Sequence, residues 1–179
     1  MIPVFLANGF EEIEALATVD ILRRAGVEVA TVGVGGKTPV GAHGIPVCAD
    51  VEEDALNIHT IDGVVLPGGM PGTTNLEASA IVQKAVAYAV ERGVMTAAIC
   101  AAPSILGHGG DLKGKKATCY PGFEQELSDA IVVNDGVVVD GNIVTASGAG
   151  VAVDFALELV RYLVSAEVAD SIRGGIQCR

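Results

Sequence analysis

Apolar and amphipathic segments alternate along the chain, and this alternation sets the expected fold. Nearly continuous apolar runs at residues 2–7, 27–34, 62–67 and 94–99 are typical of strands buried on both faces. Apolar residues recur at helical spacing in 11–25, 81–92 and 148–164, and we expect a short helix in the tail. Shorter strands are predicted at 115–119, 131–139 and 142–145, the last two paired and with turns at 134–136 and 140–141, and a hairpin is predicted within 35–44. The pattern predicts one flavodoxin-like α/β domain over residues 1–179, with a doubly wound, mostly parallel sheet sandwiched by helices.

Composition and charge exclude some classes of partner. The 179-residue chain has a formal net charge of −11 and no cluster of Lys or Arg, which argues against nucleic acid and membrane surfaces as partners. No apolar run is long enough to span a membrane, and the start lacks the basic residues of a signal peptide, so we expect a cytoplasmic protein. The four cysteines show no metal-ligand spacing, and we expect reduced thiols with neither a metal nor a cofactor.

Cys100 directly follows the apolar run 94–99, and the pattern of a helix begins at Ala101. A thiol at such a strand-to-helix elbow faces the free N–H groups of the helix, which favour the thiolate and predict a lowered pKa. The alternative is an inert buried cysteine, because free Cys packs as a small hydrophobe. The elbow by itself leaves both interpretations open.

The loop that contains Gly68 and Gly69 follows another predicted strand, at the same edge of the sheet as Cys100. Glycines leave their backbone N–H groups uncovered, and with the amide of Ala101 these groups would form an oxyanion hole. A glycine-rich turn without chemistry is the other interpretation.

Three glutamates, Glu11, Glu12 and Glu14, open the first predicted helix. We expect Glu12 to be a solvated first-turn acid, placed there for the helix dipole. Glu14 lies among apolar residues near the predicted crevice, and a carboxyl group buried beside a thiolate should take up a proton. Glu14 is therefore the candidate general acid and base.

No histidine is well placed to pair with Cys100. His108 lies eight residues further along the same predicted helix, and His59 lies in a polar loop. His43, in a glycine-flanked turn, is the one that a loop or a neighbouring subunit would bring near. No His-x-Glu follows the cysteine, which excludes a glutamine amidotransferase.

Several motifs occur together along the chain from Val4 to Asp170. They are Gly9-Phe10-Glu11-Glu12-Ile13-Glu14, Asp20-Ile21-Leu22-Arg23-Arg24-Ala25-Gly26, Leu66-Pro67-Gly68-Gly69, Ala98-Ile99-Cys100-Ala101-Ala102-Pro103 and Phe155-Ala156-Leu157. In these motifs the chain resembles the ThiJ/PfpI superfamily, in the branch of the parkinsonism-associated protein deglycase and its bacterial relatives.

The resemblance implies roles for the residues at these positions. Cys100 would be the nucleophile, Glu14 its protonated partner, and Gly69 and Ala101 the amide donors. The family is usually dimeric, and Cys48 falls where relatives place a cysteine near the dimer contact.

Two departures from the family pattern concern substrate binding. Tyr120 stands where many relatives carry a histidine close to the nucleophile. The basic residue that relatives use to bind anions aligns with His43, which leaves Arg24 as the more secure cation. These departures make a Cys–His–acid peptidase the less favoured interpretation.

The resemblance also implies a small set of activities. We expect a glyoxalase or deglycase that acts on 2-oxoaldehydes such as methylglyoxal, or on glycated protein, with a role in protection against stress. The alternative is a redox-sensing protein or holdase chaperone that uses an oxidisable cysteine.

Overall fold

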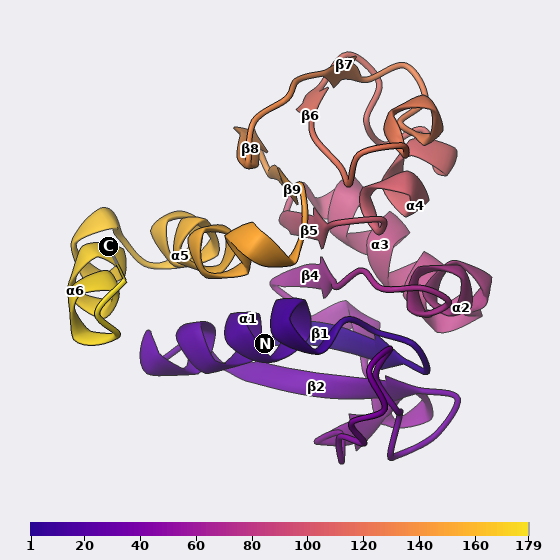
Figure 1. Ribbon diagram of the computed structural model, residues 1–179. Helices are drawn as coiled ribbons and strands as arrows, with labels where there is room; N and C mark the ends of the chain where they lie inside the picture. Colours follow the sequence, from indigo (N-terminus) through magenta and orange to yellow (C-terminus); the bar gives the residue numbers. More distant parts are fainter. Residues whose placement is uncertain (179) are drawn as a thin grey trace.

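The computed structural model describes residues 1–178, and its centre is a seven-stranded sheet with the strand order β3-β2-β1-β4-β5-β9-β8 (Figure 1). Neighbouring strands are parallel except for the antiparallel pair β8 and β9. Every residue of β1, β4, β5 and β9 is buried, as their apolar sequences require. The strands are β1 (Ile2–Ala7), β2 (Val29–Val34), β3 (Val51–Glu52), β4 (Gly63–Leu66), β5 (Met95–Ile99), β8 (Val137–Asp140) and β9 (Ile143–Ala146).

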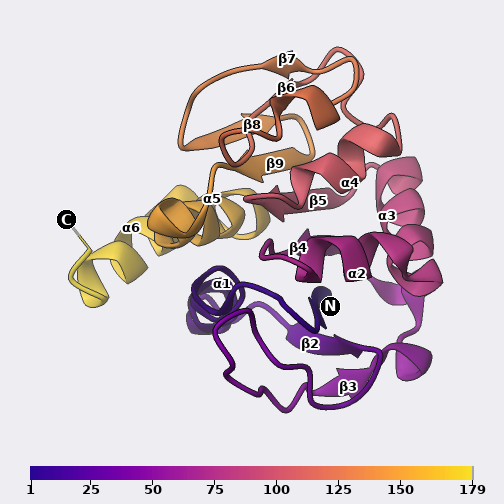
Figure 2. The same cartoon turned by 45° about the vertical axis from the view of Figure 1, so that its right-hand side comes forward.

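Helices cover both faces of this sheet (Figure 2). One buried cluster joins the sheet to α1 (Glu12–Arg24), α5 (Ala152–Leu163) and α6 (Ala166–Gly175). A second cluster joins the opposite face to α2 (Gly72–Ala78), α3 (Ala80–Arg92) and α4 (Pro103–His108). The doubly wound α/β fold predicted from the sequence is confirmed.

Shorter elements complete the chain at the edges of the sheet. A parallel two-stranded sheet forms from β6 (Lys116–Ala117) and β7 (Ile131–Val132), apart from the main sheet. The 3₁₀ helices are η1 (Glu53–Ala55), η2 (Ile58–Thr60), η3 (Glu124–Glu126) and η4 (Ala149–Val151). No helix within residues 1–178 is long and apolar enough to cross a membrane.

The structure differs from the predicted elements in several places. The predicted turn at 134–136 separates β7 from β8, but the two strands lie in different sheets, because β7 pairs with β6 and only β8 pairs with β9. The segment 35–44 forms no regular hairpin: only Val40 and Pro46 are bridged. Helix α2 was not predicted, since Gly72, Thr73 and Thr74 are poor helix formers.

Candidate active site

Cys100 lies at the sharp turn between β5 and α4, at the carboxyl edge of the sheet. Its backbone has a φ of 66°, in the left-handed region that non-glycine residues seldom adopt. Its amide donates a hydrogen bond to the Ala146 carbonyl at 2.8 Å, and its own carbonyl accepts one from the Tyr120 amide at 2.7 Å. Strand β9 and the segment after β6 therefore hold the elbow in this uncommon conformation.

The carboxyl group of Glu14, in the first turn of α1, reaches the same place. Its side chain is buried with 1% exposure, and Oε2 accepts a hydrogen bond from the Gly68 amide at 2.8 Å. Oε1 has no partner of ordinary hydrogen-bond geometry. The thiol of Cys100 is the neighbouring titratable group that acts on this carboxyl.

Only glycine fits at positions 68 and 69. A Cβ on Gly68 would lie 2.5 Å from Cys100 Cβ and 2.8 Å from Glu14 Oε2, so all three groups converge on one point. Gly69 has a φ of +88°, and a Cβ there would lie 2.5 Å from the Gly9 carbonyl oxygen. The glycines thus let the Gly69 amide approach the Cys100 sulfur, on which the amide of Ala101 also acts.

The titrations of Glu14 and Cys100 are coupled, because each group affects the pKa of the other. Burial raises the pKa of Glu14 to about 7, above its ordinary value of 4.5. Burial and the negative charge of Glu14 also raise the pKa of the Cys100 thiol to about 12, against the lowering effect of the Gly69 and Ala101 amides. The lowered pKa expected from the elbow is therefore wrong. The charge of Glu14 disappears when it binds a proton, which removes one cause of the raised thiol pKa and leaves burial.

The pattern of the DJ-1/PfpI family matches residues 1–162. The chain belongs to the DJ-1/PfpI family. This family member is 37% identical to a deglycase from Pyrococcus horikoshii, over 78% of the chain and 85% of that protein. It is 30% identical to a glutathione-independent glyoxalase from Caenorhabditis elegans, over 90% of the chain and 87% of that protein.

A solved structure of oxidized DJ-1 from Toxoplasma gondii has the same DJ-1/PfpI fold. The TM-score is 0.95 at 35% identity, and the alignment covers 98% of this chain and 97% of that one. Two DJ-1 homologues from Arabidopsis thaliana are 38% identical, but the chain spans only 41% and 44% of their length.

His43 and Glu12 meet beside the first turn of α1. His43 Nδ1 lies 2.9 Å from Glu12 Oε2, and the His43 amide donates to Glu12 Oε1 at 2.8 Å. Glu12 is buried with 5% exposure, so the expectation of a solvated acid is wrong. The carboxylate of Glu12 holds the loop around His43 against α1. It lies so close to Gly41 that a Cβ at that position would be 2.2 Å from Glu12 Oε1.

The backbone amide of Tyr120 donates a hydrogen bond to the Cys100 carbonyl, but the side chain of Tyr120 is half exposed. Its ring lies against Gly148, and the hydroxyl has no hydrogen-bond partner within residues 1–178. In this chain the tyrosine therefore borders the site without contacting a partner in it.

Arg24 does not join the other site residues in this chain. It lies in the last turn of α1, roughly 15 Å along the helix axis from Glu14. Its Nε pairs with Asp20 at 2.6 Å, and the side chain is exposed. The expectation that Arg24 binds substrate beside Cys100 therefore does not hold within one subunit.

One group of side chains within residues 1–178 has atoms close enough to hold a metal. It consists of Glu11, Glu12 and His43, with atoms that all lie within 4.8 Å of one another. Both oxygens of Glu12 already accept hydrogen bonds from the loop at His43. Glu11 likewise caps α1 by accepting from the Ile13 amide. The group therefore serves the contact between loop and helix.

Proposed function

We propose that this DJ-1/PfpI member is a cysteine-dependent glyoxalase or deglycase. Its substrates would be 2-oxoaldehydes such as methylglyoxal, or their early adducts on proteins, and its role protective under stress. The observation that carries the proposal is the buried Glu14 carboxyl beside the Cys100 thiol, between the amides of Gly69 and Ala101. The relatives named as a deglycase and a glyoxalase support it.

In the first step, the Cys100 sulfur adds to the aldehyde carbon of the substrate. The carbon–sulfur bond forms, and the carbonyl π electrons move to oxygen. Ionised Glu14 takes the thiol proton, for which a pKa of about 7 is well matched at neutral pH. The amides of Gly69 and Ala101 would stabilise the negative oxygen, as donors that are fixed before the reaction begins.

The remaining steps convert methylglyoxal into lactate without a redox partner. Glu14 returns its proton to the oxygen and then removes the hydrogen of the former aldehyde carbon as a proton, which gives an enediolate with its negative charge on the ketone oxygen. Glu14 gives this proton to the neighbouring carbon, and the hydroxyl proton of the former aldehyde carbon moves to the ketone oxygen, which yields a thioester of lactate. Water hydrolyses this thioester and restores the thiol, so the net reaction is addition of one water.

The test is lactate production from methylglyoxal by the purified protein. Cys100→Ser should abolish it, whereas Cys48→Ser, at an exposed thiol, should leave the rate unchanged. Lactate production that survives in Cys100→Ser would refute the cysteine mechanism.

A redox-sensing role for the same cysteine is the second candidate function. The similar Toxoplasma gondii structure is that of an oxidized DJ-1, which favours it. Here Glu14 and the two amides would hold an oxidised sulfur of Cys100. A protein that gains oxygen at Cys100 under mild peroxide, as seen by intact mass, but makes no lactate would support the sensor over the enzyme.

We also propose that the chain forms a homodimer through the outer face of α1. Ile13, Leu16 and Ile45 are 57%, 37% and 52% exposed, and Ile13 and Ile45 border the same surface depression. Such exposed apolar groups favour an interface. Light scattering should give twice the chain mass, and Ile13→Glu should halve it, while Val164→Glu, at another exposed apolar position, should not.

A further inference from the structure

His108, the last residue of α4, connects three elements through its side chain. Its ring nitrogen Nδ1 lies 2.5 Å from Glu77 Oε1, near the end of α2. The other ring nitrogen, Nε2, lies 2.8 Å from Glu126 Oε2, in η3. The ring is 40% exposed, so it can exchange protons with the solvent.

These two contacts require a protonated ring. A neutral imidazole has one N–H donor and one nitrogen without a hydrogen, whereas an imidazolium donates from both nitrogens. A nitrogen without a hydrogen would set its lone pair against those of a carboxylate oxygen. In agreement with this geometry, hydrogen bonds to Glu126 and Glu77 raise the pKa of His108 above its ordinary value of 6.5. The contact of His108 with both glutamates therefore depends on pH near neutrality.

The charges that face the ring come from two elements. Glu77 faces it from α2 and Glu126 from η3, and both act on the ring by their charge as well as by hydrogen bonding. Neither α4 itself nor β5, against which α4 packs, has another charged residue. Asp111, in the turn after α4, has its carboxylate beside Gly109, and burial raises its pKa.

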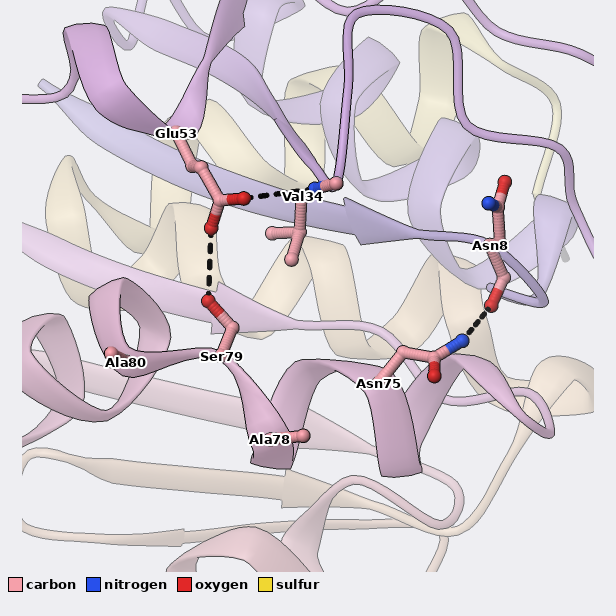
Figure 3. Close-up of a pocket in the computed structure, with 8 residues that line it drawn as sticks. Asn8, Val34, Glu53, Asn75, Ala78, Ser79 and Ala80 are labelled. Carbon is pink, nitrogen blue, oxygen red and sulfur yellow. Dashed lines mark hydrogen bonds between the residues drawn. The ribbon is translucent and has the colours of Figure 1, made fainter.

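Helix α2 is held in place on its other side. Asn75 Nδ2 donates to the Asn8 carbonyl at 2.8 Å, and the hydroxyl of Ser79, directly after α2, donates to Glu53 Oε2 at 3.0 Å (Figure 3). Neither of these donors loses a proton between pH 5 and 8. Glu77 therefore keeps its position when His108 titrates.

The 3₁₀ helix η3 is held less firmly, since none of its residues is buried. It leads back to the border of the active site through backbone hydrogen bonds. The Glu126 amide donates to the Phe123 carbonyl and the Phe123 amide to the Tyr120 carbonyl, each at 3.0 Å. The buried Leu127 anchors the chain directly after η3. A change at Glu126 should therefore be confined to the segment 120–126, which includes Tyr120.

We propose that His108 is a pH-sensitive switch, which binds η3 to α2 while both ring nitrogens are protonated and releases η3 when the ring becomes neutral. The neutral ring keeps one N–H, and the shorter contact, to Glu77, retains it, so Nε2 then repels Glu126. The stabilising contact is fully present below pH 6.5 and is lost as pH rises through the raised pKa of His108. The segment 120–126 should therefore open more often at alkaline pH.

The test is amide hydrogen exchange of the parent protein and of His108→Gln, measured by NMR at matched pH values. At equal pH the chemical rate of exchange cancels, so the ratio of the two rates reports opening of the segment. At pH 6 the amides of Phe123 and Glu126 should exchange roughly 1.5-fold to fivefold more slowly in the parent, as expected of a surface ion pair. This ratio should fall to one at the pH where the His108 ring of the parent titrates. The Val47 amide, which donates to the Pro39 carbonyl in the loop after β2, is the control and should show a ratio of one throughout.

Glu77→Gln should make the contact insensitive to pH. The amide of the new side chain can donate to Nδ1, while the one N–H of a neutral ring stays on Nε2 and donates to the stronger acceptor, Glu126. At pH 9, exchange at Phe123 and Glu126 should thus be slower in Glu77→Gln than in the parent. This variant still decides if His108→Gln does not fold.

A parent-to-variant ratio that stays the same from pH 6 to pH 9 would overturn the proposal. So would a Glu77→Gln protein that exchanges as fast as the parent at pH 9. Since the measurements follow titration and exchange and not turnover, their failure would leave the proposed function of Cys100 untouched.

Discussion

Glu12 and Glu14 lie two residues apart in the first turn of α1, and both are buried, yet their surroundings differ in kind. Glu12 faces the loop around His43. Burial would raise its pKa, but hydrogen bonds from the His43 ring and from the amides of Glu12, His43 and Ile45 outweigh burial and lower it. Glu14 faces the sheet edge, where burial raises its pKa to about 7. The hydrogen bonds from the Gly68 amide and the Cys100 thiol lower the pKa by less than burial raises it.

The difference teaches that burial alone does not assign a role to a carboxyl group. Hydrogen bonds to the charged form keep Glu12 an anion, which suits a residue that fastens a loop. Sparse bonding leaves Glu14 able to exchange a proton at neutral pH, which suits a general acid and base. Two glutamates of one helical turn thus divide structure and chemistry between them.

The largest expected effect separates the two glutamates by activity. Glu14→Gln keeps the shape of the side chain but cannot accept the thiol proton, so methylglyoxal turnover should fall by roughly 10²–10⁴-fold. Glu12→Gln should cost much less, since that carboxylate only holds the loop. Initial rates of lactate formation measure both variants, each checked for folding by circular dichroism.

Equal losses in the two variants would contradict this division. They would show that the loop at His43 matters for catalysis as much as proton transfer does, and Gly41→Ala, which would push Glu12 away, should then be equally inactive.

The next largest effect is on the free energy of unfolding, through the protonation of Glu14. Folded Glu14 keeps its proton up to a pH of about 7, whereas an unfolded glutamate releases it near 4.5. Protonated Glu14 therefore contributes stability at low pH that is lost as pH rises between these values, up to roughly 3 kcal/mol. Glu14→Gln should lack this loss and gain stability relative to the parent at pH 8, as measured by urea unfolding.

Glu12 should behave in the opposite way in the same experiment. Its lowered pKa means that the ionised form contributes stability above the ordinary value of 4.5, which is lost as pH falls. Glu12→Gln should therefore be less stable than the parent at pH 7. A Glu14→Gln variant that follows Glu12→Gln at each pH would refute the contrast between the two sites.

A third effect concerns the coupling of Glu14 to Cys100. Alkylation by iodoacetamide needs the thiolate, and in the parent protein burial and the negative charge of Glu14 raise the pKa of the Cys100 thiol to about 12. The rate at Cys100, read by peptide mass, should therefore keep rising well above neutral pH. In Glu14→Gln this rise should move to lower pH, because the charge that repels the thiolate is gone and only burial remains. The same inflection in both proteins would show that the two groups titrate independently.

The sequence predicted the parts of the site that depend on topology. Cys100 and the Gly68-Gly69 loop follow parallel strands, and the carboxyl ends of such strands meet at one edge of a sheet. The buried position of Glu14 followed from its apolar neighbours in the helix.

What the sequence missed depends on contacts between distant segments. The burial of Glu12 comes from a loop about thirty residues away, and no periodicity within α1 signals it. The extent to which burial raises the pKa of Cys100 likewise arises only once the chain is folded. The pairing of β7 with β6 instead of with the main sheet has the same origin.

The smallest effect tests whether Glu14 acts alone. The resemblance to the family implies a histidine at the position of Tyr120, but the Tyr120 hydroxyl makes no hydrogen bond within residues 1–178. Tyr120→Phe should therefore slow methylglyoxal turnover only several-fold, about the value of one neutral hydrogen bond to substrate. The Tyr88→Phe variant, whose hydroxyl donates to the His59 carbonyl far from Cys100, is the matched control and should match the parent. If Tyr120→Phe were as inactive as Glu14→Gln, the tyrosine would itself transfer a proton, and the contrast between Glu12 and Glu14 would no longer account for catalysis.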